Sequence, residues 1–372
     1  MASLRSRLSQ LSSARRAPQA ATLARSRISV TPPIYSVGRD GSSLWGVQRT
    51  RWGEHVVVER AVALASGPSV GWLMELADVD PCAAALLARA EDTAGFPPPE
   101  SWAFLDVETT GLAGGTGTYA FLIGVGVLED GHFRIRQFFM RDFDEERSLL
   151  SELASYLRSF PVIVTYNGKL FDTPILETRL ALARIAPFLD RLHHIDLLYP
   201  ARQFWRLRWG SARLADLERF VLGEERIEDV PSELIPQLYF DYLRRRDPVR
   251  LRPVFDHNAR DLLALAALTA RILKSIETCE PATEMSSPDA LELFGLSRLL
   301  ERAGAGERAR ELYQRALELG LPAEAESTAL RQLAYLCKRA GEYGQAASLW
   351  QQLAGHEEEA LRAYEELAIC YE

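Results

Sequence analysis

The stretch Trp102-Ala-Phe-Leu-Asp-Val-Glu-Thr-Thr-Gly-Leu112 joins an apolar run to two acidic residues that stand two positions apart. Side chains at positions i and i+2 of a β-strand point to the same face. Asp106 and Glu108 therefore share one face if this stretch is a strand. The run that precedes them is too apolar for an exposed strand. We expect a buried strand that presents two carboxylates at its end, where the chain turns at residues 109–111.

Two more acidic residues end similar segments. Asp172 closes Val164-Thr-Tyr-Asn-Gly-Lys-Leu-Phe-Asp172, and Asp261 closes His257-Asn-Ala-Arg-Asp261. Each has an ordinary structural explanation: Asp172 can cap a following helix, and Asp261 can interact favourably with a helix N-terminus. His257 lies four residues before Asp261, on the same helical face if the helix begins there.

Carboxylates drawn from distant parts of a chain repel one another unless cations hold them together. Their hard oxygen atoms are ligands that suit Mg²⁺ or Mn²⁺. A pair of such ions held by carboxylates commonly acts on phosphodiesters. The four acids are therefore candidate metal ligands.

The residues around these acids predict an α/β domain. Apolar or β-branched runs indicate strands, and amphipathic or Ala/Leu-rich runs indicate helices. In chain order we expect strands at residues 101–107, 119–128 and 133–139, a helix at 145–157, a strand at 162–166, and helices at 174–183 and 260–276. Periodicity alone indicates no more than the α/β class.

Composition divides the chain into four parts. Residues 1–40 are expected to be a basic disordered arm, because residues 1–39 contain seven arginines and no acidic residue. An organelle transit peptide has a similar composition. A lead-in subdomain is expected at 41–98, the α/β domain at 99–276 and a helical region at 285–372.

Size and charge limit the classes of protein. The chain has 372 residues, of which 47% are hydrophobic, enough for the cores of two or three units. No apolar run approaches the length of a membrane span. The four cysteines show neither metal nor disulfide spacing, which favours a cytoplasmic location. The net charge of −8 argues against broad, non-specific nucleic-acid binding.

The C-terminal part repeats itself. Leu296-Ser-Arg-Leu-Leu-Glu-Arg-Ala-Gly304 matches Leu333-Ala-Tyr-Leu-Cys-Lys-Arg-Ala-Gly341 at an offset of 37 residues, and the same offset aligns Tyr313 with Trp350. Stacked helix pairs produce this pattern. The segment resembles tetratricopeptide repeats with about three extra residues per period. That resemblance implies a protein partner on the concave face.

The three acidic segments resemble the Exo I, Exo II and Exo III motifs of the DEDD exonucleases in the ribonuclease H-like superfamily. Their wider context is similar to the bacterial ribonuclease H-like domain proteins that are predicted to be exonucleases. The matching segments are residues 106–122, 164–172, 194–198, 214–223 and 257–261. The resemblance covers roughly residues 40–276 and implies a ribonuclease H-like mixed sheet flanked by helices.

The resemblance also implies roles for single residues. Asp106, Glu108, Asp172 and Asp261 would be the ligands of two Mg²⁺ or Mn²⁺ ions, and His257 would take a proton from the attacking water or orient it. Histidine here occupies a spacing that one known subtype fills with tyrosine, so both roles stay open. The implied activity is 3′-to-5′ exonuclease cleavage of single-stranded DNA or RNA.

Residues 201–213 contain four arginines and two tryptophans. Arginine for phosphates and tryptophan for base stacking suit a single strand, although an amphipathic helix with its aromatic residues in the core fits the same pattern. With residues beside the acids included, six side chains are expected to contact nucleic acid: Thr109, Asn167, Phe171, Trp205, Arg206 and Arg208.

Two further functions fit the sequence. One is a non-catalytic scaffold that binds nucleic acid and recruits a partner through its repeats. The other is a structure-specific endonuclease with the same chemistry. Clustered carboxylates cost stability without a metal ion, so the presence of all four acids favours an enzyme over a scaffold.

Overall fold

The structure is a computed structural model. It describes most of the chain, namely residues 46–63, 68–111, 115–226, 229–279, 289–356 and 358–371. The basic arm expected at residues 1–40 lies outside the described residues. In the described part of the chain, no helix is both long and apolar enough to cross a bilayer.

The described residues build one seven-stranded mixed sheet in the order β1-β2-β5-β4-β3-β6-β7. The strand that carries Asp106 and Glu108, β3, pairs with β4 on one side and β6 on the other. The β3–β6 and β6–β7 pairs are parallel, and the other pairs are antiparallel. The strands are β1 (Gly46–Thr50), β2 (Gly53–Ala63), β3 (Trp102–Thr109), β4 (Ala120–Glu129), β5 (His132–Phe139), β6 (Val162–Thr165) and β7 (His193–Asp196).

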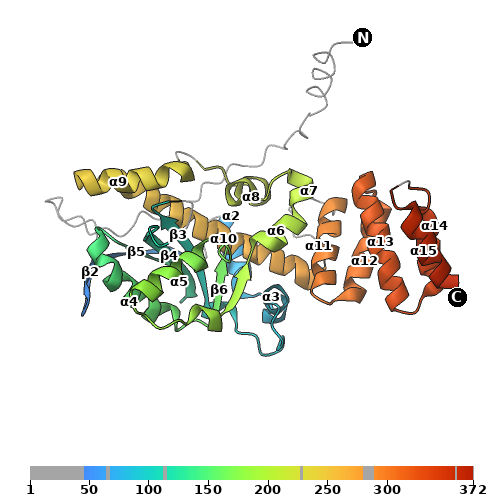
Figure 1. The fold of residues 1–372 in the computed structure, drawn as a ribbon, viewed down its shortest axis with the longest axis horizontal. Coiled ribbons are helices and arrows are strands. Elements are labelled where there is room, and N and C mark those ends of the chain that lie inside the picture. The colour runs from blue at the N-terminus through green and yellow to red at the C-terminus, as the bar shows by residue number, and fades with distance from the viewer. Residues whose placement is uncertain are drawn as a thin grey trace, which may run out of the picture.

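Helices cover both faces of the sheet (Figure 1). Alternate residues of β3 enter different cores: Trp102 and Phe104 pack with the long helix α10, and Ala103 and Leu105 pack on the opposite face. The helices of this part are α2 (Pro68–Ala77), α3 (Pro81–Ala88), α4 (Glu146–Leu157), α5 (Asp172–Leu182), α6 (Leu198–Phe204), α7 (Arg206–Trp209), α8 (Leu214–Val221), α9 (Ile235–Arg245) and α10 (Arg252–Thr278). The α/β class and the mixed sheet flanked by helices are confirmed.

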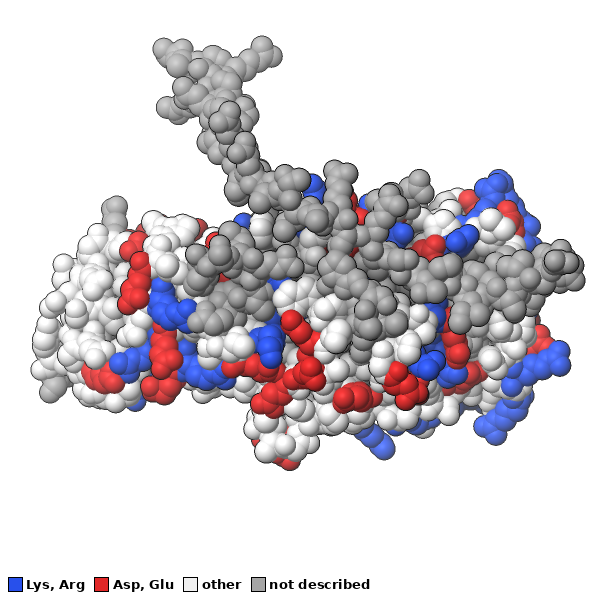
Figure 2. Space-filling view, turned by 180° about the vertical axis from the view of Figure 1, so that it is seen from behind, with Lys and Arg blue, Asp and Glu red and all other residues white. Residues whose placement is uncertain are grey.

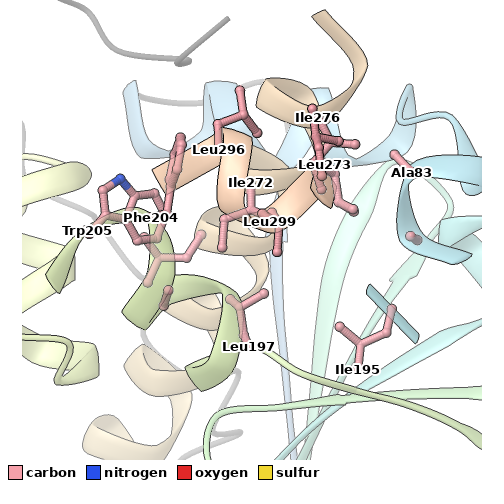
Figure 3. Close-up of a cluster of buried hydrophobic side chains, with 14 of the residues drawn as sticks. Ala83, Ile195, Leu197, Phe204, Trp205, Ile272, Leu273, Ile276, Leu296 and Leu299 are labelled. Carbon is pink, nitrogen blue, oxygen red and sulfur yellow. The ribbon is translucent and has the colours of Figure 1, made fainter. Parts of the chain in front are cut away.

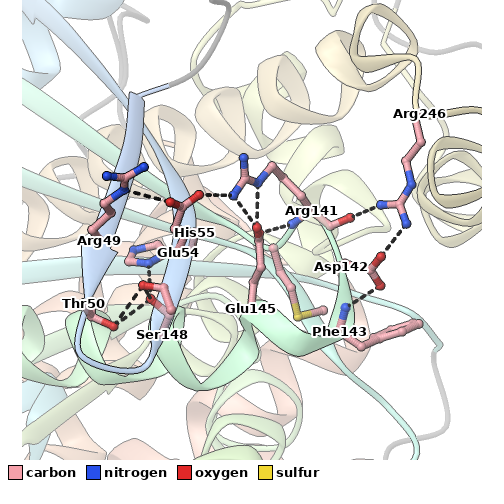
Figure 4. A network of polar contacts seen from close by, with 12 residues as sticks. Arg49, Thr50, Glu54, His55, Arg141, Asp142, Phe143, Glu145, Ser148 and Arg246 are labelled. Atoms are coloured by element: carbon pink, nitrogen blue, oxygen red, sulfur yellow. Dashed lines mark hydrogen bonds and ion pairs between the residues drawn. The ribbon is translucent and has the colours of Figure 1, made fainter.

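The hairpin β1–β2 extends the same sheet, because β2 pairs with β5 along its length. A polar network fastens the hairpin to α4 (Figure 4): Ser148 Oγ lies 2.9 Å from His55 Nδ1 and 2.8 Å from Thr50 Oγ1. Arg141 contacts both Glu54 and Glu145. The described part of the lead-in segment therefore shares the sheet of the α/β domain.

The C-terminal helices stand side by side at one end of the molecule (Figure 1). The offset of 37 residues links equivalent positions, since Tyr313 and Trp350, like Ala309 and Ala346, are fully buried. Small residues at these crossings let neighbouring helices approach closely. The helices are α11 (Ala290–Arg302), α12 (Gly306–Leu319), α13 (Ala323–Arg339), α14 (Tyr343–Leu353) and α15 (Ala360–Tyr371).

The helical region and the α/β part share one hydrophobic core. Figure 3 shows Phe204 and Trp205 of the α6–α7 segment beside Leu296 and Leu299 of α11, with the end of α10 alongside. The helices α6 and α11 cross closely at Gly295, where an added Cβ atom would lie 2.7 Å from the backbone of Phe204.

Two helix starts differ from expectation. The helix α10 begins at Arg252 rather than at residue 260, because a proline in its first turn is compatible with helix initiation. Asp261 therefore lies well inside the helix, and its explanation as an N-terminal dipole interaction is wrong. The helix α5 begins at Asp172, and its N-cap position is Phe171.

We predict that Gly295→Ala destabilises the fold by about 1–3 kcal/mol, because the new methyl group meets backbone atoms that cannot yield locally. Gly344→Ala is the matched control, since Gly344 is also helical and an added Cβ atom there meets nothing within 4 Å. Thermal unfolding of both variants checks this. A Gly295→Ala protein as stable as the control would contradict the close crossing.

Candidate active site

Asp106 and Glu108 lie on the face of β3 that α10 covers. Asn258 of α10 donates from Nδ2 to Asp106 Oδ2 at 2.7 Å and to its backbone oxygen at 3.2 Å. The nearest Glu108 oxygen is 4.0 Å from Nε2 of His257, also on α10. The expectation that the two acids share one face is confirmed.

A row of residues across three strands allows this close approach. Asp106 is paired with Gly124 of β4, and Gly124 is paired with Gln137 of β5. Gln137 Nε2 donates to Asn258 Oδ1 at 2.8 Å and so fixes the orientation of the amide. An added Cβ atom at Gly124 would lie 2.3 Å from Asn258 Oδ1. Gly124 is therefore needed for Asn258 to reach Asp106.

His257 and Asp261 are one turn apart on α10, and His257 Nε2 lies 3.6 Å from Asp261 Oδ2. Each is also held from outside the helix. Asp229 Oδ1 lies 2.9 Å from His257 Nδ1, and Arg226 Nη2 donates to Asp261 Oδ1 at 2.5 Å. Both residues therefore keep one atom directed towards the site.

Asp172 stands at the first position of α5, directly after the turn that follows β6. The carboxylate of Asp196 shapes that turn, because it accepts hydrogen bonds from the backbone N–H groups of Asn167 at 2.7 Å and Lys169 at 3.0 Å. Asn167 adopts a φ of 67°, in the left-handed region that asparagine tolerates. Asp196 thus has a structural role that positions the loop before Asp172.

The carboxylates influence one another's ionisation. The pKa of Asp106 is raised to about 7. Burial is the main cause, and the charge of Asp261 is a second cause. Burial and the charge of Asp106 raise the pKa values of Glu108 and Asp172 well above their ordinary range. This is the behaviour of acids that share a space poor in compensating charge.

His257 responds in the opposite direction. Burial favours its neutral form, but the hydrogen bond to Asp229 and the charges of Asp261 and Glu108 outweigh burial and raise its pKa to about 9. Without metal ions, the imidazole therefore carries a positive charge at neutral pH and balances part of the carboxylate charge.

The ligand atoms available here are carboxylate oxygens, the type that a hard divalent cation prefers. Four carboxylates gather here, and Asp106 Oδ1 accepts no hydrogen bond from the described residues. The side chains do not form a closed coordination shell: among the described residues no three His, Cys, Asp or Glu groups converge on one point. Asp106, Glu108, Asp172 and Asp261 are therefore candidate ligands that would have to draw together around an ion.

Three of the residues expected to contact nucleic acid border this site. Thr109 ends β3, and its hydroxyl donates to the backbone oxygen of Gly111 at 2.8 Å. Asn167 and Phe171 belong to the loop before Asp172, and Phe171 is 42% exposed. All three remain candidates for substrate contacts.

The expectation for Trp205 and Arg208 is corrected. Trp205 is fully buried in the core beside the helical region, so its ring cannot stack on a base. Arg208 lies 2.6 Å from Glu292 of α11, with little exposure to solvent. For these two residues the alternative interpretation is correct: the segment is amphipathic and buries one side, which α11 covers. Arg206 is exposed.

Sequence reasoning missed Asn258, Arg226 and Asp229. Asn258 had a detectable signal, since it lies between His257 and Asp261 in the segment that carries a candidate ligand. Arg226 and Asp229 belong to an irregular segment, where no periodicity marks a residue that reaches the site.

We predict that metal-free protein loses stability as the pH rises through the interval between 3.8 and about 7, because folded Asp106 binds its proton more tightly than the unfolded chain does. Asp106→Asn cannot ionise, so its thermal midpoint should fall less between about pH 5 and pH 8 in the presence of a chelator. The exposed Asp190→Asn serves as control. Equal pH dependence of Asp106→Asn and wild type would contradict the prediction.

Comparison with known proteins shows which family the α/β part resembles. Residues 103–273 match the family described as the RNase_H superfamily. The chain is 31% identical over 272 residues to "Uncharacterized protein YprB" of Bacillus subtilis (strain 168), covering 72% of this chain and 64% of that protein. The chain thus spans less than two thirds of the length of this relative.

Among solved structures, the chain is similar to the family B DNA polymerase from the hyperthermophilic archaeon Pyrobaculum calidifontis. The TM-score is 0.40 and the identity 18%, over 59% of this chain and 29% of the polymerase. The family match spans β3 through most of α10, the segment that contains every candidate metal ligand. Residues 103–273 of this chain are thus similar to the RNase_H superfamily.

Proposed function

We propose that this protein is a metal-dependent nuclease that hydrolyses phosphodiester bonds, acting as a 3′-to-5′ exonuclease on single-stranded DNA or RNA. The observation that carries the proposal is that the acids gather around one turn of α10. His257 Nε2 lies 4.0 Å from Glu108 and 3.6 Å from Asp261. The next residue, Asn258, donates to Asp106. Such an electrostatically strained group of acids in a domain similar to the RNase_H superfamily is suited to cation binding.

In the proposed mechanism, Asp106, Glu108, Asp172 and Asp261 would hold Mg²⁺ or Mn²⁺. Ions bound there would supply an activated water and positive charge for the phosphodiester. If bound ions neutralised the carboxylate charges, the pKa of His257 would fall. Its Nε2, which faces Glu108 and Asp261, can then accept a proton from water or orient it.

Substrate contacts would come from the rim of the site. Phe171 exposes a ring beside Asp172 and can stack on a base. Thr109 follows Glu108 in the chain, Asn167 belongs to the loop before Asp172, and both offer polar groups. Figure 2 shows acidic and basic side chains interspersed on one face of the molecule, so affinity must come from local contacts rather than from a broad basic field.

We predict that Asp106→Asn lowers hydrolysis by more than about 100-fold, since loss of an outer-sphere partner alone typically costs a metal site 10–100-fold. The measurement is a degradation time course on end-labelled single- and double-stranded DNA and RNA, with Mg²⁺ or Mn²⁺ and with a chelator. Asp190→Asn is the control. A product ladder that shortens from the 3′ end supports the exonuclease.

Other outcomes of the same experiment separate the alternatives. Discrete internal products indicate an endonuclease with the same chemistry. Substrate that is bound but intact indicates a non-catalytic scaffold. Hydrolysis that survives both Asp106→Asn and chelation would falsify the proposed site.

We predict that Arg206→Ala weakens nucleic-acid binding and reduces the salt dependence by about one counterion, because Arg206 is exposed and no described carboxylate pairs with it. Arg208→Ala is the matched comparison, since it removes the ion pair with Glu292 and should lower thermal stability without changing the salt slope. Binding isotherms at several salt concentrations test both. Equal salt slopes for wild type and Arg206→Ala would remove Arg206 from the interface.

A cytoplasmic location is part of the proposal, and the unpaired state of the four cysteines is consistent with it. A protein partner for the helical region remains a prediction from the repeat pattern.

A further inference from the structure

Two charged side chains of the segment after α8, Arg226 and Asp229, contact α10. Arg226 makes a different contact with each guanidinium nitrogen: Nε to Glu218 at 2.6 Å, Nη1 to Asp229 at 2.9 Å and Nη2 to Asp261 at 2.5 Å. Its side chain is only 10% exposed. A planar guanidinium with all three nitrogens engaged has little freedom to move.

Asp229 links this arginine to the histidine. Its Oδ2 accepts from Arg226, and its Oδ1 lies 2.9 Å from His257 Nδ1 and 3.7 Å from Arg260 Nη1. Glu218, Arg226, Asp229 and His257 therefore form a continuous chain of contacts from α8 to α10.

These contacts are made at Nδ1 of His257 and Oδ1 of Asp261, so the other atom of each side chain lies towards the site, where Ser232 Oγ is 3.5 Å from His257 Nε2. His257 is held at Nδ1, so Nε2 is directed to Glu108 and Asp261. Asp261 is held at Oδ1, so Oδ2 remains on the side of His257 Nε2. Metal-binding side chains are generally oriented in this way: a neighbouring group binds one atom of the side chain and leaves the other atom for the ion.

A purely structural role explains this arrangement poorly. Burial raises the pKa of Glu218 to about 7 despite its contact with Arg226, because a buried carboxylate loses its hydration. Replacing buried ion pairs by apolar residues is often neutral or stabilising. Charges placed at that cost beside the candidate ligands indicate a role at the site.

We propose that Arg226 and Asp229 are positioning residues of the proposed nuclease site: Arg226 orients the Asp261 carboxylate for a divalent ion, and Asp229 orients His257 by holding Nδ1. This inference rests on the proposed function. It adds residues that contact neither the substrate nor the ion and act through Asp261 and His257.

The first test is Mn²⁺ binding to the full chain, measured by isothermal titration calorimetry at about pH 8, where Glu218 is ionised. Arg226→Gln should weaken Mn²⁺ binding by about 10- to 100-fold, and Arg226→Lys should restore part of it. Arg219→Gln is the control, because Arg219 is exposed on α8. Unchanged binding overturns the proposal, and so does tighter binding, which would mean that Arg226 competes with the ion.

Glu218→Gln gives a second route if Arg226→Gln does not fold. It removes only the outer anchor of Arg226, and it should also weaken Mn²⁺ binding. Unchanged Mn²⁺ affinity of a folded Glu218→Gln protein counts against the proposal.

The second test concerns Asp229. Asp229→Ala should lower kcat about 10- to 100-fold with little change in KM, and Asp229→Glu should recover part of it. In ¹⁵N-histidine spectra, the protected Nδ1–H signal of His257 should disappear in Asp229→Ala. Wild-type turnover by Asp229→Ala overturns the role of Asp229.

The experiments distinguish failure of the proposed nuclease activity from failure of the proposed positioning roles. If the wild-type protein hydrolyses nothing but Arg226→Gln weakens Mn²⁺ binding, the proposed nuclease activity is wrong and the positioning of Asp261 stands. If hydrolysis depends on Mn²⁺ while both variants behave as wild type, the nuclease stands and the positioning roles are wrong.

Discussion

Carboxylates that share a small, poorly hydrated space cannot all ionise cheaply, and this constraint governs the structure around β3. Burial is the leading cause of the raised pKa values of Asp106, Glu108 and Asp172. The fold offsets it with an amide from Asn258 on Asp106 and a guanidinium from Arg226 on Asp261. These contacts stabilise an acidic group that would otherwise be driven apart, and they still leave it deficient in positive charge.

The geometry of the site also depends on how closely α10 approaches the sheet. Asp106, Gly124 and Gln137 form one row across three strands, and Asn258 lies over that row. A larger residue at position 124 would displace the amide and with it the hydrogen bond to Asp106. The register of the sheet is therefore part of the site.

Local patterns in the sequence predicted those features that depend on local structure. The strand with two acids on one face and the histidine one turn before Asp261 follow from short-range periodicity. The offset of 37 residues follows from the internal repeat, and the mixed sheet was implied only by the resemblance to ribonuclease H-like proteins. Trp205 and Arg208 were misassigned because an amphipathic segment does not reveal which neighbour covers it, and α11 is distant in sequence. Arg226 and Asp229 reach α10 from an irregular segment 28 to 35 residues away, which periodicity cannot detect.

The shared core at the α6–α11 crossing limits how the helical region can be removed or replaced. Removing the helical region would uncover Phe204 and Trp205, and an α/β part left alone would tend to self-associate. The two parts should melt in one cooperative transition. Any other helical array joined to this domain would need a residue as small as Gly295 where it meets α6.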